Sequence, residues 1–443
     1  MIYLKRIGFY IVLFPCLNLF WVVYPLDSLL LRFLICMCLG TLFVLLNIFP
    51  IHRKTNDKGQ KYTSCGFELT LAALIIASVN VVFYISLFLR VEEASRIPAI
   101  VSACMCFFLT LIMLVNGVLR LFVTAKQPGV VLKILVFAFW WVPILNLVLL
   151  FLIMKKVYRE MEFNEYRYLL NTERRDERLC ETKYPLYMVH GVFFRDWQNF
   201  NYWGRIPGEL IKNGAKIYYG NHQSAASVEQ SAEELKQGLL KIIEETNCEK
   251  VNIIAHSKGG IDARYMISML GMGKYTASLT TINTPHYGCK FVSRILEKTS
   301  QKTLSLVGSG YEKIFSKLGD DNPDFYGSLL PLTDESCARW NEILKDDENV
   351  LYQSTGSMMK TPFGSIPPLI LGYNLIKKHE GDNDGLVSVK SMVWGDFLGV
   401  AVPKGNEGIS HGDVIDLTKK NIDGFDVCEF YIDLVNKLRL KGL

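Results

Sequence analysis

Ala255-His256-Ser257-Lys258-Gly259-Gly260 is the stretch that decides the fold of this chain. An apolar, β-prone run at residues 251–254 precedes it, and apolar residues at helical spacing follow it. A strand, a serine and then a helix form a nucleophile elbow, a strained turn that lifts the serine oxygen clear of a sheet. Small residues must flank the serine, because the helix turns back tightly against the strand. The usual pattern has glycine in place of Ala255, and a small-residue turn with an incidental serine is the alternative interpretation.

Strands and helices alternate on both sides of this stretch, from residue 184 to residue 443. Such alternation predicts an α/β domain, a mostly parallel sheet with helices on both faces. Between about residues 286 and 349 the alternation gives way to short helical pieces, a cap insertion that either moves over a site or packs permanently. The predicted strands are residues 185–190, 215–219, 250–256, 278–283 and 350–355, and the predicted amphipathic helix is 228–245.

The first third of the chain has a different composition. Half of the residues in the chain are hydrophobic, and long apolar runs follow one another before residue 155. A helix needs about 20 apolar residues to cross a bilayer. The sequence therefore predicts an all-α transmembrane domain at residues 1–154 in a multi-pass integral membrane protein, followed by a charged linker at 155–183. Its five predicted spans are residues 7–26, 29–49, 65–89, 98–123 and 130–154.

Charges near these spans bear on orientation. Arg32, Glu68, Arg120 and Lys133 lie near span ends, where we expect them to anchor the helices at the interface. A cytoplasmic amino terminus gathers most basic loop residues inside, and five spans then carry the α/β domain outside. Basic residues just after residue 154 and five scattered, unpaired cysteines weaken this extracytoplasmic prediction. The formal net charge of +5 does not indicate a nucleic-acid partner.

A serine nucleophile needs a histidine base, and the base needs a third group that fixes its tautomer. Three histidines follow Ser257, namely His286, His379 and His411. His411 precedes the last predicted helix, in a loop that suits a base. His286 follows a predicted strand, and a hydrogen bond to a neighbouring loop is its expected role.

Two carboxylates compete for the role of the acid. Asp384 lies in Asp382-Asn383-Asp384-Gly385, a turn beyond the strand at 350–355, and it is the better candidate. Asp382 is its rival, and either residue alone is compatible with a simple turn carboxylate. The oxyanion needs two backbone N–H donors. We expect one from Lys258 and the other from Val192, where Gly191 allows close approach of the backbone.

Several segments, in the same order, resemble bacterial triacylglycerol lipases of the α/β-hydrolase fold. They are Val189-His190-Gly191, Tyr202-Trp203-Gly204, the elbow, Thr280 to His286, Asn383 to Val387 and Ser410-His411-Gly412-Asp413. The resemblance begins near residue 184 and covers none of the predicted membrane domain. It implies an α/β-hydrolase fold and a catalytic triad of Ser257, Asp384 and His411.

Many members of this family bind a structural calcium near the catalytic histidine, and Asp413 occupies a position similar to one ligand. A second carboxylate is expected upstream of the acid, yet no Asp or Glu occurs between Glu348 and Glu380. Calcium takes six to eight oxygen ligands. We therefore expect no metal and no cofactor, with a structural calcium at Asp413 as the alternative.

Together these features predict a membrane-anchored serine hydrolase that cleaves carboxylic esters of acylglycerols or related lipids through an acyl-enzyme. Its partners would be the lipid substrate and the membrane. A phospholipase, a thioesterase or an acyltransferase on the same triad is an alternative, because one fold hosts many chemistries. A catalytically silent binding protein is the alternative from another class.

Overall fold

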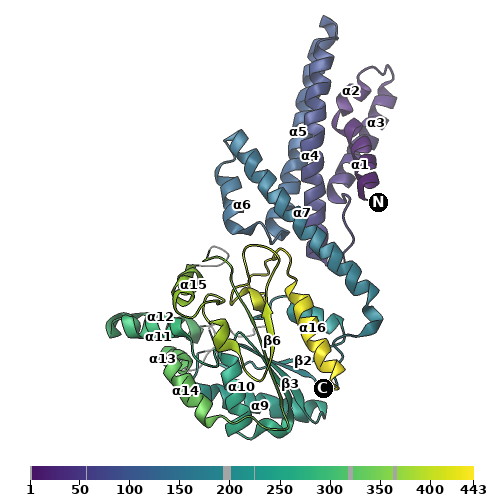
Figure 1. Ribbon diagram of the computed structural model, residues 1–443. Coiled ribbons are helices and arrows are strands. Elements are labelled where there is room, and N and C mark those ends of the chain that lie inside the picture. The colour runs from purple at the N-terminus through teal and green to yellow at the C-terminus, as the bar shows by residue number, and fades with distance from the viewer. Residues whose placement is uncertain (1, 56, 193–200, 224, 318–322, 363–366) are drawn as a thin grey trace. The chain divides into compact units, whose positions relative to one another are not determined.

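The computed structural model describes residues 2–55, 57–192, 201–223, 225–317, 323–362 and 367–443 (Figure 1). The chain divides into two units, Met1–Glu173 and Arg174–Leu443. The second unit begins ten residues before the predicted start at 184, because the preceding segment packs onto it. Arg174 forms an ion pair with Glu429 at 2.6 Å, and the amide of Cys180 donates to Asn213 O at 2.9 Å.

The first unit consists of helices and short connections in its described residues. Three of its helices are long and apolar enough to cross a membrane, namely Leu29–Ile48, Lys58–Phe88 and Ser95–Thr124. The first predicted span is a helix interrupted at Asn18, with α1 before the interruption and α2 after it. The helices are α1 (Ile2–Leu17), α2 (Leu19–Val23), α3 (Leu29–Ile48), α4 (Lys58–Phe88), α5 (Glu93–Thr124), α6 (Gly129–Ala138) and α7 (Pro143–Glu173).

The fifth predicted span differs from the structure. Residues 139–142 divide it into α6 and α7, because Pro143 has no N–H and disfavours helical geometry in the residue before it. Pro143 instead begins α7, where its missing donor costs nothing. The α7 helix then continues to Glu173, so most of the predicted linker at 155–183 is helical.

The four ionisable residues predicted as interfacial anchors bond to the protein. Glu68 is fully buried and pairs with Arg6 at 2.7 Å, which a carboxylate in an apolar bundle requires. The other three bond to carbonyl oxygens at helix ends: Arg120 to Asn47 O, Lys133 to Ala125 O and Arg32 to Tyr24 O.

The second unit contains a six-stranded parallel sheet with the strand order β2-β1-β3-β4-β5-β6. The α/β prediction is confirmed, and the five predicted strands are present with ends shifted by a few residues. Sequence analysis missed β6, whose residues are mostly half-buried and lack a strict alternation. The strands are β1 (Leu186–Val189), β2 (Ile217–Tyr219), β3 (Val251–His256), β4 (Thr276–Ile282), β5 (Leu351–Ser357) and β6 (Asp396–Ala401).

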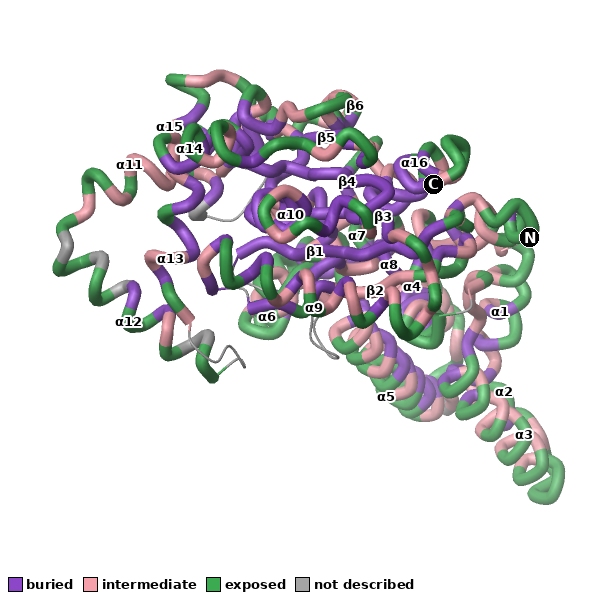
Figure 2. The backbone as a smooth tube through the Cα atoms, turned by 90° about the horizontal axis from the view of Figure 1, so that it is seen from below, coloured by how far each residue is buried: buried purple, intermediate pink, exposed green. Residues whose placement is uncertain are grey.

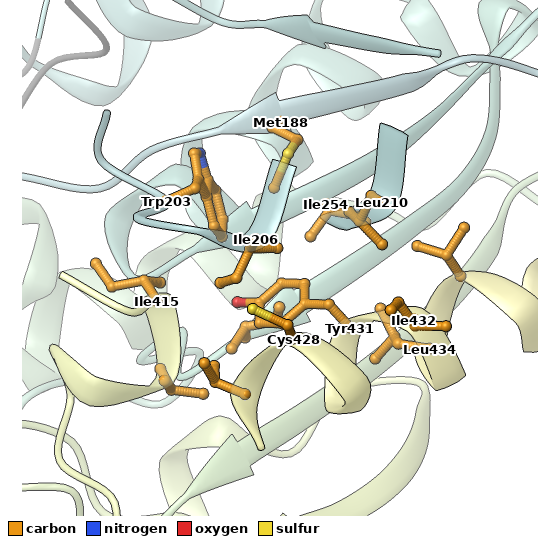
Figure 3. Close-up of a cluster of buried hydrophobic side chains, with 14 of the residues drawn as sticks. Met188, Trp203, Ile206, Leu210, Ile254, Ile415, Cys428, Tyr431, Ile432 and Leu434 are labelled. Atoms are coloured by element: carbon orange, nitrogen blue, oxygen red, sulfur yellow. The ribbon is translucent and has the colours of Figure 1, made fainter. Parts of the chain in front are cut away.

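Helices cover both faces of this sheet, and Figure 2 shows its central strands as buried backbone. Neighbouring strand residues point to opposite faces. Met188 and Ile254 therefore pack with Trp203 and Tyr431 under α8 (Ile206–Lys212) and α16 (Val427–Leu440) (Figure 3). Residues of the opposite register, including Tyr187 and Ile253, pack under α9 (Val228–Thr246) and α10 (Lys258–Met269).

The predicted cap insertion lies between β4 and β5 and is helical in its described residues. Its apolar side chains pack in one cluster with Val192 and Ile261. The helices are α11 (Lys290–Lys298), α12 (Gln301–Lys317), α13 (Phe325–Leu329) and α14 (Asp334–Ile343), and α15 (Pro367–His379) follows β5.

Candidate active site

Ser257 lies in a tight turn between β3 and α10. Its φ of 55° and ψ of −130° lie in a region that residues with a side chain rarely adopt. The amide of Ser257 donates to Ile282 O at 3.0 Å, which holds the turn against β4. A Cβ at Gly259 would meet His190 O at 2.3 Å, and one at Gly260 would meet Thr284 Oγ1 at 2.2 Å. The small residues of the elbow are thus sterically required.

Asp384 is fully buried in the turn after α15 and accepts four hydrogen bonds. Its Oδ2 accepts from His411 Nδ1 at 2.6 Å and from Asn283 Nδ2 at 2.6 Å. Its Oδ1 accepts from the amides of Leu386 at 2.8 Å and Val387 at 2.7 Å. Both oxygens therefore face donors only, which suits an ionised carboxylate.

Asp382, the rival carboxylate, is exposed and pairs with Lys377 at 2.5 Å. Within the described part of the chain, its side chain bonds to Lys377 and to no histidine. The geometry around His411 thus favours Asp384 as its partner.

His411 follows β6 and precedes α16, and its backbone amide donates to Asp384 O at 2.9 Å. Its ring lies 4.5 Å, centre to centre, from the ring of His256, the neighbour of Ser257. With Nδ1 bonded to Asp384, Nε2 is the nitrogen left for a serine hydroxyl. The described contacts include no hydrogen bond between Ser257 and His411, a bond that often tightens only when substrate binds.

Tyr202 and His256 form a polar link that the sequence did not indicate. The Tyr202 hydroxyl accepts from the amide of Gly191 at 3.0 Å and donates to His256 Nδ1 at 2.7 Å. Burial, with a smaller contribution from His411, lowers the pKa of His256 well below 6.5. His256 is therefore neutral near pH 7, and its Nδ1 can accept this hydrogen bond. The link joins the predicted oxyanion loop to the elbow.

The two predicted oxyanion donors are Val192, in the loop after β1, and Lys258, at the start of α10. Val192 comes after Gly191, where an added Cβ would lie 2.9 Å from the Cβ of Ser257. Lys258 is the first residue of α10, so its backbone N–H belongs to the unpaired first turn of a helix. Its side chain points into the interior, where Nζ lies 2.7 Å from Asp262 and 3.0 Å from Ser231.

The two remaining downstream histidines lie in other surroundings. His286 is buried, its Nε2 lies 2.9 Å from Thr281 Oγ1, and its ring stacks on Trp394. Burial, with a smaller contribution from Arg264, lowers the pKa of His286 well below 6.5. This agrees with the structural role expected for it. His379 is exposed at the end of α15.

The residues near His411 do not fit a calcium site. Asp413 Oδ2 accepts from Ser410 Oγ at 2.6 Å and from the Ser410 amide at 3.1 Å, so it closes its own turn. Within the described ranges, no group of three or more His, Cys, Asp or Glu side chains could hold a metal ion. Calcium would need several oxygen ligands that these residues do not supply.

Comparison with known proteins bears on this geometry. A family model described as "Putative serine esterase (DUF676)" matches residues 215–344, which include the elbow. A triacylglycerol lipase of Pseudarthrobacter phenanthrenivorans is 25% identical over 320 residues, covering 59% of this chain and 98% of the relative. A triacylglycerol lipase of Burkholderia plantarii is also 25% identical, and the match covers 59% of this chain and 87% of that lipase. The chain is a carboxylic ester hydrolase.

The predicted resemblance of this hydrolase to lipases is thus confirmed. Among solved structures, a metagenomic carboxyl esterase, MGS0156, has a TM-score of 0.47 and 14% identity, covering 59% of this chain and 76% of its own. Staphylococcus hyicus lipase has a TM-score of 0.45 and 19% identity, covering 59% of this chain and 97% of its own.

Proposed function

We propose that the protein is a membrane-anchored serine hydrolase that cleaves carboxylic esters of acylglycerols or related lipids. The observation that carries the proposal is the 2.6 Å contact between His411 and the buried Asp384, combined with the strained backbone of Ser257. Sequence relatives named triacylglycerol lipases support lipid esters as the substrate class.

In this proposal, Ser257 Oγ attacks the ester carbonyl while His411 Nε2 takes its proton. Asp384 holds the imidazole in the required tautomer and stabilises the imidazolium that forms. The backbone N–H groups of Lys258 and Val192 bind the oxyanion. His411 then protonates the leaving alcohol, and water hydrolyses the acyl-enzyme by the same steps in reverse.

A catalytically silent binding protein is less well supported than an enzyme. A positive φ at a serine costs of order 1–3 kcal/mol, and it persists where the surrounding structure and a function require it. The four hydrogen bonds to Asp384 also stabilise an ionised carboxylate, which polarises the imidazole of His411. A phospholipase, a thioesterase or an acyltransferase would use the same groups, and the acyl donor and acceptor separate these activities.

Anchoring should matter for substrates that lie in a bilayer. We expect a fragment of residues 174–443 to cleave short, dispersed esters at the rate of the full-length protein, because it contains every proposed catalytic residue. It should begin at Arg174, so that the ion pair with Glu429 is kept. On lipid in liposomes the fragment should be slower by about 10²-fold or more, since anchoring raises the local substrate concentration. If the fragment and the full-length protein cleaved the liposome lipid at equal rates, a role for the spans in substrate access would be contradicted.

We also expect activity to survive chelation. The Asp413 carboxylate accepts a hydrogen bond from Ser410, and the residues around it supply too few oxygen ligands for calcium. Hydrolysis of a short ester should therefore be unchanged after dialysis against EDTA, with a calcium-dependent lipase treated in parallel as the control. Activity that is lost in EDTA and restored by calcium would refute the expectation.

A further inference from the structure

Contacts in the first unit show which helix ends lie together. Thr63, near the start of α4, donates to Thr124, the last residue of α5, at 2.9 Å. Arg6, near the start of α1, pairs with Glu68 of α4 at 2.7 Å. The start of α1, the start of α4 and the end of α5 therefore lie at one end of this helical unit.

The end of α3 lies there too. Arg120, one turn before the end of α5, donates to Asn47 O at 2.7 Å. The amide of Arg53, just beyond α3, donates to Ser64 Oγ at 2.8 Å. We call this end of the unit, where α1 and α4 begin and α3 and α5 finish, the basic end.

Four segments starting or finishing at the basic end are long enough to cross a bilayer. The 20 residues of α3 span about 30 Å, and α4 and α5 are longer. Residues 2–23 span about 33 Å as one interrupted helix. At the interruption, the buried Asn18 side chain donates to Asn80 at 2.9 Å and accepts from Tyr84 at 2.8 Å, so its amide group has partners inside the unit.

Neither apolar half of the fifth predicted span is long enough to cross a bilayer alone. The 10-residue helix α6 is about 15 Å long, and the apolar part of α7 at 143–154 is about 18 Å long. The hydrocarbon core is about 30 Å thick. Asn146 Nδ2 donates to Val136 O at 2.7 Å near the turn, and Glu160 accepts from the amides of Lys126 and Gln127 near the base. The two helices therefore form an antiparallel hairpin that starts and finishes at the basic end.

The outer face of this hairpin is apolar and exposed. Phe137, Trp140, Trp141, Ile144 and Phe151 are between 66% and 80% exposed. In Figure 1 the turn between α6 and α7 stops partway along the α4 and α5 pair. A face of this kind, continuous with membrane-crossing helices and flanked by lysines at its base, fits the acyl chains of one leaflet.

We propose that residues 129–154 form a re-entrant hairpin in one leaflet, and that the amino terminus and the ester hydrolase unit both lie on the cytoplasmic side. The proposal rests on the proposed membrane anchoring. Four crossings return the chain to its starting side, whereas the five spans predicted from the sequence would have placed the hydrolase outside. The substrate would then be an ester lipid of the cytoplasmic leaflet.

The charge distribution assigns the side. Cytoplasmic loops of membrane proteins carry an excess of Lys and Arg. The opposite end of the unit carries only three such residues before residue 160, Arg32, Arg90 and Arg96. The basic end carries twelve, namely Lys5, Arg6, Arg53, Lys54, Lys58, Lys61, Arg120, Lys126, Lys133, Lys155, Lys156 and Arg159. All eleven cysteines of the chain are free thiols, which agrees with a reducing compartment.

Single cysteines in a cysteine-free, full-length variant test the proposal in bacterial cells, with a membrane-impermeant maleimide as the probe. Lys58→Cys, Lys126→Cys and Lys156→Cys should react only after the cells are permeabilised, whereas Glu92→Cys should react in intact cells. Trp141→Cys, at the hairpin turn, should react only in detergent.

Each other pattern overturns a defined part of the proposal. Reaction of Lys156→Cys, without Lys126→Cys, in intact cells would show a fifth crossing. Reaction of Trp141→Cys in permeabilised cells would place the hairpin in water. The reverse of the whole pattern would place the hydrolase outside. Extraction of the protein by alkaline carbonate would refute the membrane anchoring itself, whereas loss of ester hydrolysis by Ser257→Ala tests the enzyme separately.

A fusion to the unaltered chain gives a second measurement that does not depend on removing cysteines. Green fluorescent protein attached after Leu443 should fluoresce, because it folds in the cytoplasm. A dark full-length fusion, together with an active alkaline phosphatase fusion at the same position, would overturn the cytoplasmic assignment.

Discussion

Replacement of Ser257 by alanine is expected to abolish ester hydrolysis and labelling by a fluorophosphonate probe, and to leave the protein folded. The rate should fall by at least about 10³-fold, because the variant has no nucleophile and keeps only binding and oxyanion stabilisation. Alanine and serine both carry a Cβ, so the positive φ at residue 257 costs the same in both proteins. The midpoint of thermal unfolding should therefore change little.

Ser309→Ala is the matched control for this variant. Ser309 is an exposed serine on α12, and its replacement should change neither labelling nor hydrolysis. Labelling that survives in Ser257→Ala would show that another residue is the nucleophile. Loss of the folded state in Ser257→Ala would be detected by the thermal melt, and Ser257→Cys, which is close to serine in size, would then test the nucleophile.

Replacement of Asp384 by asparagine is expected to lower kcat by about 10⁴-fold, the effect of the same change in other serine triads. The reason lies in the donors around the carboxylate. Oδ1 accepts hydrogen bonds from two backbone N–H groups, and Oδ2 accepts them from His411 and Asn283. An amide has one oxygen and one NH₂ group, so in either orientation a donor would face two donors. The His411 ring would lose its orientation or its tautomer.

Asp382→Asn is the control for this prediction. Asp382 is exposed and pairs only with Lys377 among the described contacts, and exposed ion pairs contribute about 0–1 kcal/mol. Its replacement should leave kcat within about twofold of the wild type. Steady-state rates on a short ester measure both variants. A large loss in Asp382→Asn with a small loss in Asp384→Asn would reverse the assignment of the acid.

Local patterns in the sequence were sufficient for much of the α/β unit. The alternation of strands and helices depends on burial at short spacing, and the small residues around Ser257 depend on contact with the next turn of chain. Both requirements act within a few residues, so they leave a readable pattern. The edge strand β6 was missed because a half-buried edge demands less of its side chains.

Long-range contacts accounted for what could not be predicted. Asp382 and Asp384 are equivalent as turn residues, and only the approach of His411 and Asn283 from other parts of the chain distinguishes them. Tyr202 stands in a segment that resembles lipases, yet no local pattern indicated that its hydroxyl joins Gly191 to His256. Hydrogen bonds between residues far apart in the chain leave no periodic pattern to read.

The sequence by itself determined the division into an apolar helical part and an α/β hydrolase, because composition and periodicity report directly which surfaces avoid water. Only the tertiary structure decided how the apolar segments run. The length of an apolar segment shows that it can enter a bilayer. Whether it crosses or returns to the same side depends on the residues that its two ends contact. The contacts of Asn146 with Val136 and of Glu160 with Lys126 return α7 to the end where α6 began. Those contacts bring together residues between 10 and 34 positions apart, so no local pattern in the chain could indicate them.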